Sequence, residues 1–190
     1  MVSVIAQSTA LVLIDLQQGI VAPARFPYSS EQVLTRCQRL AARCREAGAT
    51  VVLVNVGWAT DHSDYPNGLA DAPSPLPSAE KMESWMTLCN GIAENGDLHI
   101  TKHQWGAFTG TELDLQLRRR GVDTIIVAGI ATNFGVESTL RHGWELGYNM
   151  VVAEDACTSA DTTLHNMAFE YIFPRIARVT QTDEITLTKR

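Results

Sequence analysis

Short, unbroken apolar runs separated by helical patterns are the feature that most limits what this chain can fold into. Most of the runs lack polar alternation, which indicates strands that are buried on both faces of a parallel sheet. The runs occupy residues 10–15, 50–56, 98–101, 124–129, 149–154 and 177–180. Because helical segments fall between them, the sequence predicts a doubly wound α/β fold: a six-stranded, mainly parallel sheet with helices on both faces.

Four stretches between these runs carry helix signals. They span residues 29–48, 111–121, 136–147 and 159–173. The first follows a serine cap, and the first three end on glycine, the residue that most readily takes the left-handed conformation at a helix end. No linker, repeat or low-complexity tract interrupts this order, and 190 residues suit one core, so we expect a single domain over residues 1–190.

Composition limits the partners and the compartment. The formal net charge of -6 argues against nucleic acid, whose phosphates require a basic surface. The first apolar run stops at Asp15 and follows no basic segment, so we expect no signal peptide and no membrane span. The four cysteines lack any paired spacing typical of zinc ligands. We therefore expect a cytoplasmic protein with reduced thiols.

Three residues follow strands at the edge of the predicted sheet where ligands bind. In open parallel sheets that edge lies beyond the carboxyl ends of the strands. Asp15 ends the first strand, Lys102 follows the third, and Gly135 follows the fourth. Taken alone, Asp15 is as well explained by a helix cap or a surface carboxylate, and Lys102 by a solvated side chain.

The order of the sequence blocks around these residues resembles a known family. DLQ at 15–17, KHQWGAFTGTEL at 102–113 and GIATNFGVEST at 129–139 are similar to the three motif blocks of the isochorismatase-like, or cysteine hydrolase, superfamily. EDACTSAD at 154–161, followed by His165, is similar to its closing segment. The resemblance covers nearly the whole chain.

The resemblance implies a catalytic triad of Asp, Lys and Cys, and here the cysteine position falls on Gly135. Without a thiolate no covalent acyl-enzyme forms. Cys157 is the nearest cysteine by strand order, but a packed thiol is the better interpretation. The branch of true isochorismatases likewise carries glycine and cleaves a vinyl ether, which implies that Asp15 is a general acid with a pKa raised by burial, and that Lys102 pairs with a substrate carboxylate.

The same resemblance implies a cis peptide bond between Ile130 and Ala131 and backbone N–H groups, those of Ala131 and Gly135, that face the substrate. The expected substrate-binding residues are Gln17, Trp58, Trp105, Phe108, Ala131 and Asn133. Core packing explains the aromatic residues equally well, and a turn explains Asn133. A dicarboxylate substrate also calls for a guanidinium, for which Arg25 is the one candidate, with a surface role as the alternative.

The proline-rich loop at 57–78 is expected to lie over the active site or to contact another subunit of a homo-oligomer, a dimer or tetramer. Asp61, His62 and Asp64 lie in it, but a polar loop explains them better than a metal site, and we expect neither a metal nor a cofactor.

Three functions fit the sequence. One is vinyl ether hydrolysis of a small acidic substrate without a covalent intermediate. Another is a catalytically silent family member that binds a small molecule. The third is an amide hydrolase that uses water directly.

Overall fold

The computed structural model describes residues 1–189 and contains one central six-stranded sheet. Its strands, in spatial order, are β4 (Leu98–Lys102), β3 (Thr50–Val56), β2 (Thr9–Ile14), β5 (Thr124–Ile130), β6 (Asn149–Thr158) and β7 (Arg178–Thr180). All five pairings are parallel. The doubly wound α/β prediction is confirmed, and the sheet is parallel throughout.

The chain order places a switch point between two central strands. From β2 the chain continues outward to β3 and β4, and it then crosses back to build β5, β6 and β7 on the other side of β2. In such sheets the point where strand order reverses is where ligands bind. The carboxyl ends of β2 and β5 therefore define the place to look for a site.

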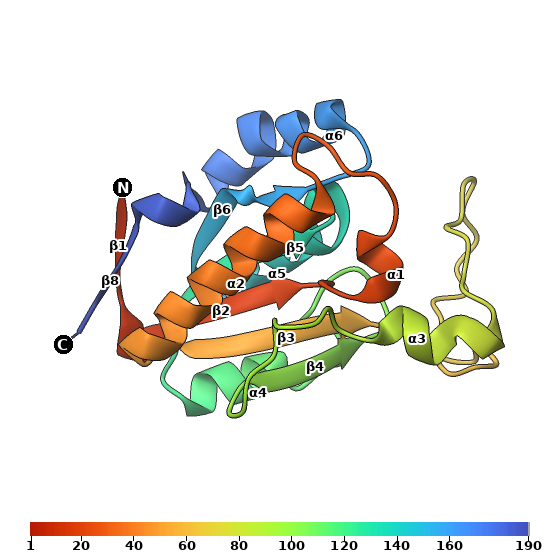
Figure 1. Ribbon diagram of the computed structural model, residues 1–190, viewed down its shortest axis with the longest axis horizontal. Coiled ribbons are helices and arrows are strands. Elements are labelled where there is room, and N and C mark those ends of the chain that lie inside the picture. Colours follow the sequence, from red (N-terminus) through yellow and green to blue (C-terminus); the bar gives the residue numbers. More distant parts are fainter. Residues whose placement is uncertain (190) are drawn as a thin grey trace.

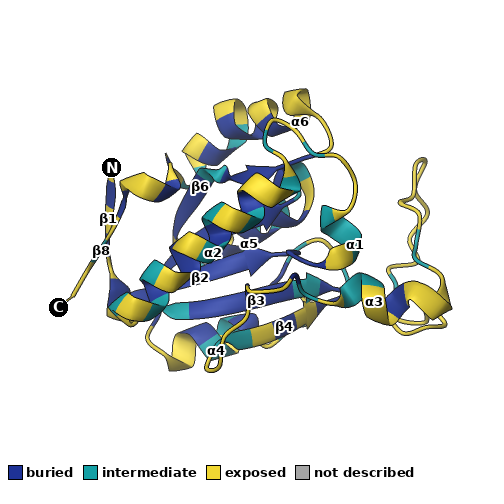
Figure 2. Cartoon of the chain, in the orientation of Figure 1, coloured by how far each residue is buried: buried dark blue, intermediate teal, exposed yellow. Residues whose placement is uncertain are grey.

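Helices cover both faces of the sheet (Figure 1). Helix α2 (Ser30–Ala47) packs on one face through one hydrophobic cluster, which contains Leu11 and Leu13 of β2. The other face is covered by α4 (Leu113–Arg119), α5 (Glu137–Glu145), η4 (Ala168–Ile172) and η5 (Phe173–Arg175), through a second cluster that contains Val12 and Ile14. Successive β2 residues point to opposite faces, so one strand contributes to both cores. Figure 2 shows the buried sheet and the exposed outer sides of the helices.

Helix α2 begins and ends at the residues that its sequence signals indicate. The Ser29 side chain accepts a hydrogen bond from Gln32 N at 3.2 Å, and Gln32 Oε1 accepts one from Ser29 N at 3.0 Å. Gly48 ends the helix with a φ of 83°. This reciprocal capping satisfies backbone donors that the first turn of a helix leaves unpaired.

Three expected helices are shorter than their sequence patterns. α4 begins two residues after Thr111, whose Oγ1 accepts from Leu113 N at 3.2 Å in a local turn. α5 is preceded by a π-helical turn, η3 (Thr132–Val136). The expected 159–173 helix divides into α6 (Thr162–Met167) followed by η4 and η5. Local side-chain caps and π turns shift these boundaries in ways that apolar periodicity does not encode.

Some elements have no counterpart in the sequence prediction. β1 (Val2–Ile5) pairs in parallel with β8 (Ile185–Thr188) in a separate two-stranded sheet that joins the two ends of the chain. Short helical turns also occur: η1 (Ala6–Ser8), α1 (Gln18–Val21), η2 (Ala79–Lys81), α3 (Met82–Met86) and η6 (Thr182–Glu184). No helix within residues 1–189 has the length and apolar character needed to cross a bilayer.

The loop at 57–78 does not close over the sheet as expected. Between β3 and η2 the chain extends away from the body as an arm, which is exposed along most of its length (Figures 1 and 2). Leu69 in this arm is fully exposed. The base of the arm is held by the Trp58 ring, which lies 5.2 Å from the Tyr65 ring and 5.7 Å from the Trp85 ring.

Candidate active site

Asp15 lies at the carboxyl end of β2 in an unusual backbone conformation. Its φ is 53°, in the left-handed region that side chains other than glycine seldom adopt. Two backbone hydrogen bonds hold this turn: Asp15 N donates to Val54 O at 2.8 Å, and Gln17 N donates to Asp15 O at 2.9 Å. Strain of this kind costs about 1–3 kcal/mol and persists where the surroundings over-determine it, often at functional sites.

Lys102 ends β4 and reaches the Asp15 carboxyl. Its Nζ donates to Asp15 Oδ2 at 2.8 Å and to Gln104 O at 3.2 Å. The Lys102 side chain is 1% exposed and that of Asp15 is 7% exposed, so water screens this pair poorly. The sequence separates the two residues by 87 positions, and the sheet brings them together.

The Asp15 carboxyl has one satisfied and one unsatisfied oxygen. Oδ2 accepts from Lys102, whereas Oδ1 is buried and has no hydrogen-bond partner within residues 1–189. Burial raises the pKa of Asp15, and the Lys102 ammonium opposes that shift without cancelling it. An acid held in this environment retains its proton to higher pH than an exposed aspartate does, which is the property a general acid needs.

Gly135, in η3, faces the same carboxyl. A Cβ at this position would lie 3.2 Å from Asp15 Oδ2 and 2.9 Å from Ile14 Cγ2. It would also lie 3.4 Å from Trp105 O. The residue that the resemblance equates with a catalytic cysteine therefore lies against the acid, and it offers no side-chain atom there.

The turn from β5 into η3 is shaped by close backbone approach. A Cβ at Gly129 would lie 2.2 Å from Ile14 O, and its φ of 127° is one that L side chains rarely adopt, so only glycine fits. The peptide bond between Ile130 and Ala131 is cis, as the resemblance implies. Phe134 N and Val136 N both donate to Ala131 O, at 3.1 and 3.2 Å. These bonds fold the 131–135 turn tightly beside the end of β2.

Two of the expected substrate-binding residues have other roles in the structure. The Gln17 amide donates to Val56 O and Trp85 O at 2.9 and 3.1 Å and accepts from Val56 N at 2.8 Å, so both of its donor hydrogens are used by backbone. Phe108 is buried in the core against Tyr148, with ring centroids 5.9 Å apart. Both residues thus have structural roles in the fold, and their contact with substrate stays a prediction.

The remaining expected residues lie on the segments that follow the carboxyl ends of β3, β4 and β5. The Trp105 ring is half-exposed and packs edge-on against Phe134, with centroids 4.8 Å apart. Trp58 Nε1 donates to His103 O at 2.7 Å. Asn133 Oδ1 accepts a short hydrogen bond from Ser159 Oγ, and this bond helps to hold the Asn133 side chain in place.

Arg25 follows α1 and donates through Nη2 to Ile20 O at 2.7 Å. Its Nε is buried without a partner within residues 1–189, and burial lowers its pKa. The guanidinium is thus partly withdrawn from solvent rather than held on the open surface.

The polar residues of the arm bond to the arm itself and its base. Asp64 Oδ1 accepts from Ala59 N at 2.8 Å, Asp61 Oδ1 accepts from Ser63 N at 3.0 Å, and the His62 ring bonds Pro77 O at 3.0 Å. The described residues contain no cluster of three or more His, Cys, Asp or Glu side chains arranged to hold a metal ion.

Cys157 is fully buried in β6 and pairs with Gly129 in the sheet. Burial raises the pKa of its thiol well above the ordinary value. A thiol in this state is a poor nucleophile, which agrees with its interpretation as a packed side chain.

Phe134 and His165 were not among the expected site residues. Phe134 lies inside the third motif block, but its packing against Trp105 depends on how two distant loops meet. His165 is buried beneath the same turn, where its ring contacts Thr132 Oγ1 at 2.9 Å. The sequence does indicate His165, because it follows the block at 154–161 that resembles the family's closing segment, but this resemblance assigns the histidine no role.

Asp15, Lys102 and Gly135 meet at the switch point of a parallel α/β sheet, the place where this class of fold binds its ligands. The Isochorismatase domain model matches residues 9–184, and the chain belongs to the isochorismatase family of hydrolases. It is 49% identical over 181 residues to the isochorismatase family protein YecD of Escherichia coli O157:H7, covering 95% of each chain. It is 30% identical to the ureidoacrylate amidohydrolase RutB of Stutzerimonas stutzeri, covering 87% of this chain and 76% of that relative.

A solved structure agrees with this assignment. An isochorismatase family protein from Burkholderia thailandensis superposes with a TM-score of 0.90 at 38% sequence identity, covering 94% of both chains.

Proposed function

We propose that this hydrolase cleaves the vinyl ether of a small acidic substrate, with Asp15 as general acid and without a covalent intermediate. The observation that carries the proposal is the position of Gly135. A Cβ added at this position would lie 3.2 Å from Asp15 Oδ2. The side of the carboxyl that a nucleophilic side chain would occupy is therefore left without one. Hydrolysis at this site therefore needs an acid and a water molecule rather than an enzyme thiolate.

The proposed reaction begins with proton transfer from Asp15 to the terminal vinyl carbon. The ether oxygen stabilises the resulting oxocarbenium ion, and water adds to its carbon. The hemiketal loses the alcohol as its carbon–oxygen bond breaks, which yields a ketone, and a proton from the added water restores Asp15. For an enolpyruvyl ether the ketone is pyruvate.

The roles of the other groups follow from charge and position. Lys102 provides an ammonium for a substrate carboxylate, and its contact with that carboxylate weakens its hold on Asp15. The N–H groups of Ala131 and Gly135 are proposed to receive substrate oxygens. Trp58, Trp105 and Asn133 are proposed to border the substrate, with Trp105 as the exposed aromatic wall.

Direct hydrolysis of an amide by water is the second candidate, and the resemblance to ureidoacrylate amidohydrolases favours it. The buried, proton-retaining Asp15 is better suited to donate a proton than to activate water as a base. A catalytically silent binding protein would have no use for a strained, desolvated acid paired with a buried lysine.

The discriminating experiment measures pyruvate release from isochorismate beside ammonia release from a panel of amides that includes ureidoacrylate. Pyruvate without ammonia supports the proposal. Ammonia without pyruvate favours amide hydrolysis, and neither product favours the binding protein.

The assembly and compartment also belong to the proposal. We propose a homo-oligomer, a dimer or tetramer, in which the arm at 57–78 contacts a second subunit, because its Leu69 side chain is fully exposed. Sedimentation of the wild type and L69D at matched concentrations tests this.

The free, buried thiols Cys37, Cys44, Cys89 and Cys157 suit the proposed cytoplasmic location.

A further inference from the structure

A hydrogen-bond chain connects the turn at Gly135 to Glu154, a residue of β6. Thr132 Oγ1 lies 2.9 Å from His165 Nδ1, and His165 Nε2 lies 2.9 Å from Glu154 Oε1. Thr132 and His165 are almost completely buried. The mechanism proposed above uses none of these three side chains.

Glu154 determines which ring nitrogen of His165 carries the proton. Its carboxylate also accepts from Tyr28 OH at 3.0 Å and from Gln181 Nε2 at 2.9 Å. Burial alone would raise the pKa of Glu154, but the hydrogen bonds from His165, Gln181 and Tyr28 together lower it. An ionised Glu154 is an acceptor only, so His165 Nε2 donates to it, and in the neutral ring Nδ1 then accepts from the Thr132 hydroxyl.

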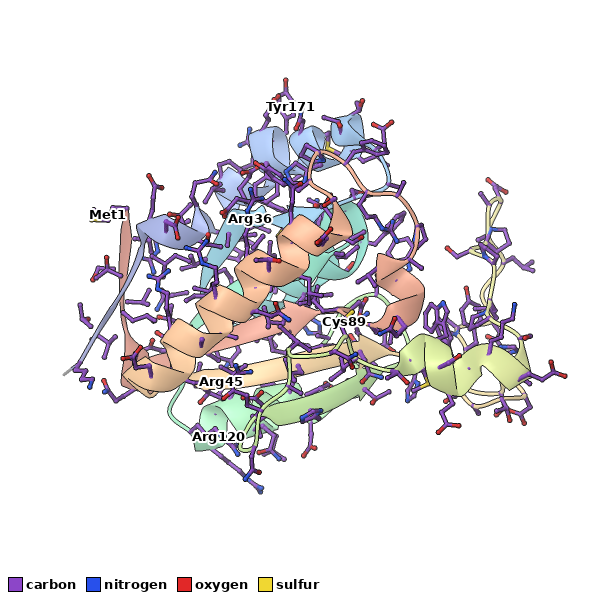
Figure 3. All side chains as sticks on the ribbon, in the orientation of Figure 1. Met1, Arg36, Arg45, Cys89, Arg120 and Tyr171 are labelled. Carbon is purple, nitrogen blue, oxygen red and sulfur yellow. The ribbon has the colours of Figure 1, made fainter. Side chains whose placement is uncertain are left out.

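The surroundings restrict the His165 ring. Its centroid lies 4.6 Å from that of Phe169 and 6.1 Å, edge-on, from that of Tyr28. The Arg36 guanidinium lies over the Tyr28 ring, 4.4 Å from its centroid, and Arg36 extends from the first half of α2 (Figure 3). These neighbours fix the orientation of the His165 ring, and with it the direction in which Nδ1 accepts the hydrogen bond from the Thr132 hydroxyl.

Thr132 occupies the turn that presents Gly135 to Asp15. It follows Ala131, whose carbonyl accepts from Phe134 N and Val136 N. The next residue, Asn133, is anchored separately by Ser159 at the end of β6. Two neighbouring side chains of the turn thus bond to the segment from β6 to α6. The bond from Thr132 leads through the buried His165 ring to the partly buried Glu154 carboxylate.

We propose that His165 and Glu154 are positioning residues that hold the 131–135 turn, through Thr132, at the distance from Asp15 that the reaction needs. This inference rests on the proposed function. The pair touches the turn and not the substrate. Its loss therefore moves the backbone N–H groups of the turn away from the positions that the transition state needs, and it changes the space between the turn and Asp15. The expected consequence is a loss in kcat with little change in KM.

The test compares T132V, which removes the hydroxyl and keeps the shape, with T132S, which keeps the hydroxyl. T132V and H165L are expected to lower kcat roughly 10- to 100-fold, the usual effect of removing a partner that orients an active group. T132S is expected to recover most of that loss, and H165Q a part, since its amide can both donate and accept. T9V is the matched control: Thr9 is a buried threonine that donates to Ile5 O at 2.8 Å at the other end of β2.

A second measurement does not require activity. In a G135C background, the rate at which iodoacetamide labels the new thiol reports where the turn lies, and T132V is expected to change that rate while T132S and T9V do not. Melting temperatures of all variants are measured in parallel.

If T9V lowers kcat as much as T132V at equal loss of melting temperature, the effect is only structural and the inference is wrong. It is also wrong if T132V alters neither kcat nor the labelling rate. If the wild type releases no pyruvate but T132V alters labelling, the positioning role stands and the proposed function fails.

Discussion

The Asp15 carboxyl is held on one side only: Lys102 Nζ lies 2.8 Å from Oδ2, and the buried Oδ1 has no partner in the described part of the chain. A lysine this close would ordinarily keep an aspartate ionised, but burial outweighs it and raises the pKa of Asp15. The acid therefore keeps its proton to higher pH than an exposed aspartate does, and a substrate carboxylate that draws Lys102 away is expected to favour the protonated form further.

Asp15→Asn is expected to abolish turnover, because an amide cannot deliver the proton. A general acid contributes typically 10²- to 10⁴-fold, so a loss of at least that size is expected in kcat. Asp15→Glu should retain little activity because its carboxyl is misplaced by one methylene. Steady-state pyruvate release, with circular dichroism to verify folding, measures both. Wild-type turnover by D15N would exclude Asp15 as the acid.

Activity is expected to decline as pH rises through the pKa of Asp15 in the enzyme–substrate complex, because the protonated form is the active one. That midpoint should lie above 3.8, since burial raises the pKa. In K102M the ammonium that opposes the shift is gone, so the midpoint should move to still higher pH. Profiles of kcat for both proteins test the sign. A midpoint that moves to lower pH in K102M would contradict the assigned electrostatics.

Lys102→Ala is expected to weaken the binding of anionic substrates more than neutral ones. A hydrogen bond to a charged group contributes about 1.5–3 kcal/mol, which corresponds to a rise in KM of roughly 10- to 100-fold for a carboxylate substrate. The comparison uses each carboxylate substrate and its methyl ester. Equal effects on the acid and the ester would mean that Lys102 does not bind the carboxylate.

Much of the fold could be predicted from the sequence because its signals are local. The apolar runs are long and unbroken, and α2 carries both a capping box and a terminal glycine, so β2 to β7 and this helix follow from the pattern. The β1–β8 pair could not be predicted in this way, because two four-residue strands at opposite ends of the chain support each other only after the chain has folded.

The candidate site was partly predictable for the same reason. Asp15, Lys102 and Gly135 follow strands, and parallel strands bring their ends to one edge. Gln17 and Phe108 lie in the same motif blocks, but whether a side chain bonds to backbone, enters the core or faces substrate depends on packing that spacing does not reveal. The contact between Thr132 and His165 joins residues 33 positions apart and has no local signal.

Gly135→Cys is expected to create a thiol that iodoacetamide labels faster than the four native cysteines at neutral pH. All four are buried, and burial raises the pKa of each, to about 12 for Cys44. Residue 135 is also buried, but a thiol there would lie beside the Asp15–Lys102 pair, whose ammonium favours the thiolate. G135A is the matched control for the strain of a Cβ that lies 2.9 Å from Ile14 Cγ2. If G135C folds like G135A but labels no faster than Cys157, residue 135 does not face the site.

The most direct test of the account follows the oxygen of water. Isochorismate is hydrolysed in H₂¹⁸O with pyruvate reduced to lactate as it forms, and mass spectrometry locates the label in both products, with D15N as the inactive control. If Asp15 protonates the vinyl carbon, water adds to the enolpyruvyl carbon, so the label appears in lactate and the released ring alcohol keeps its original oxygen. Label in the ring alcohol, or the same products at the wild-type rate from D15N, would contradict acid-catalysed vinyl ether hydrolysis by this site.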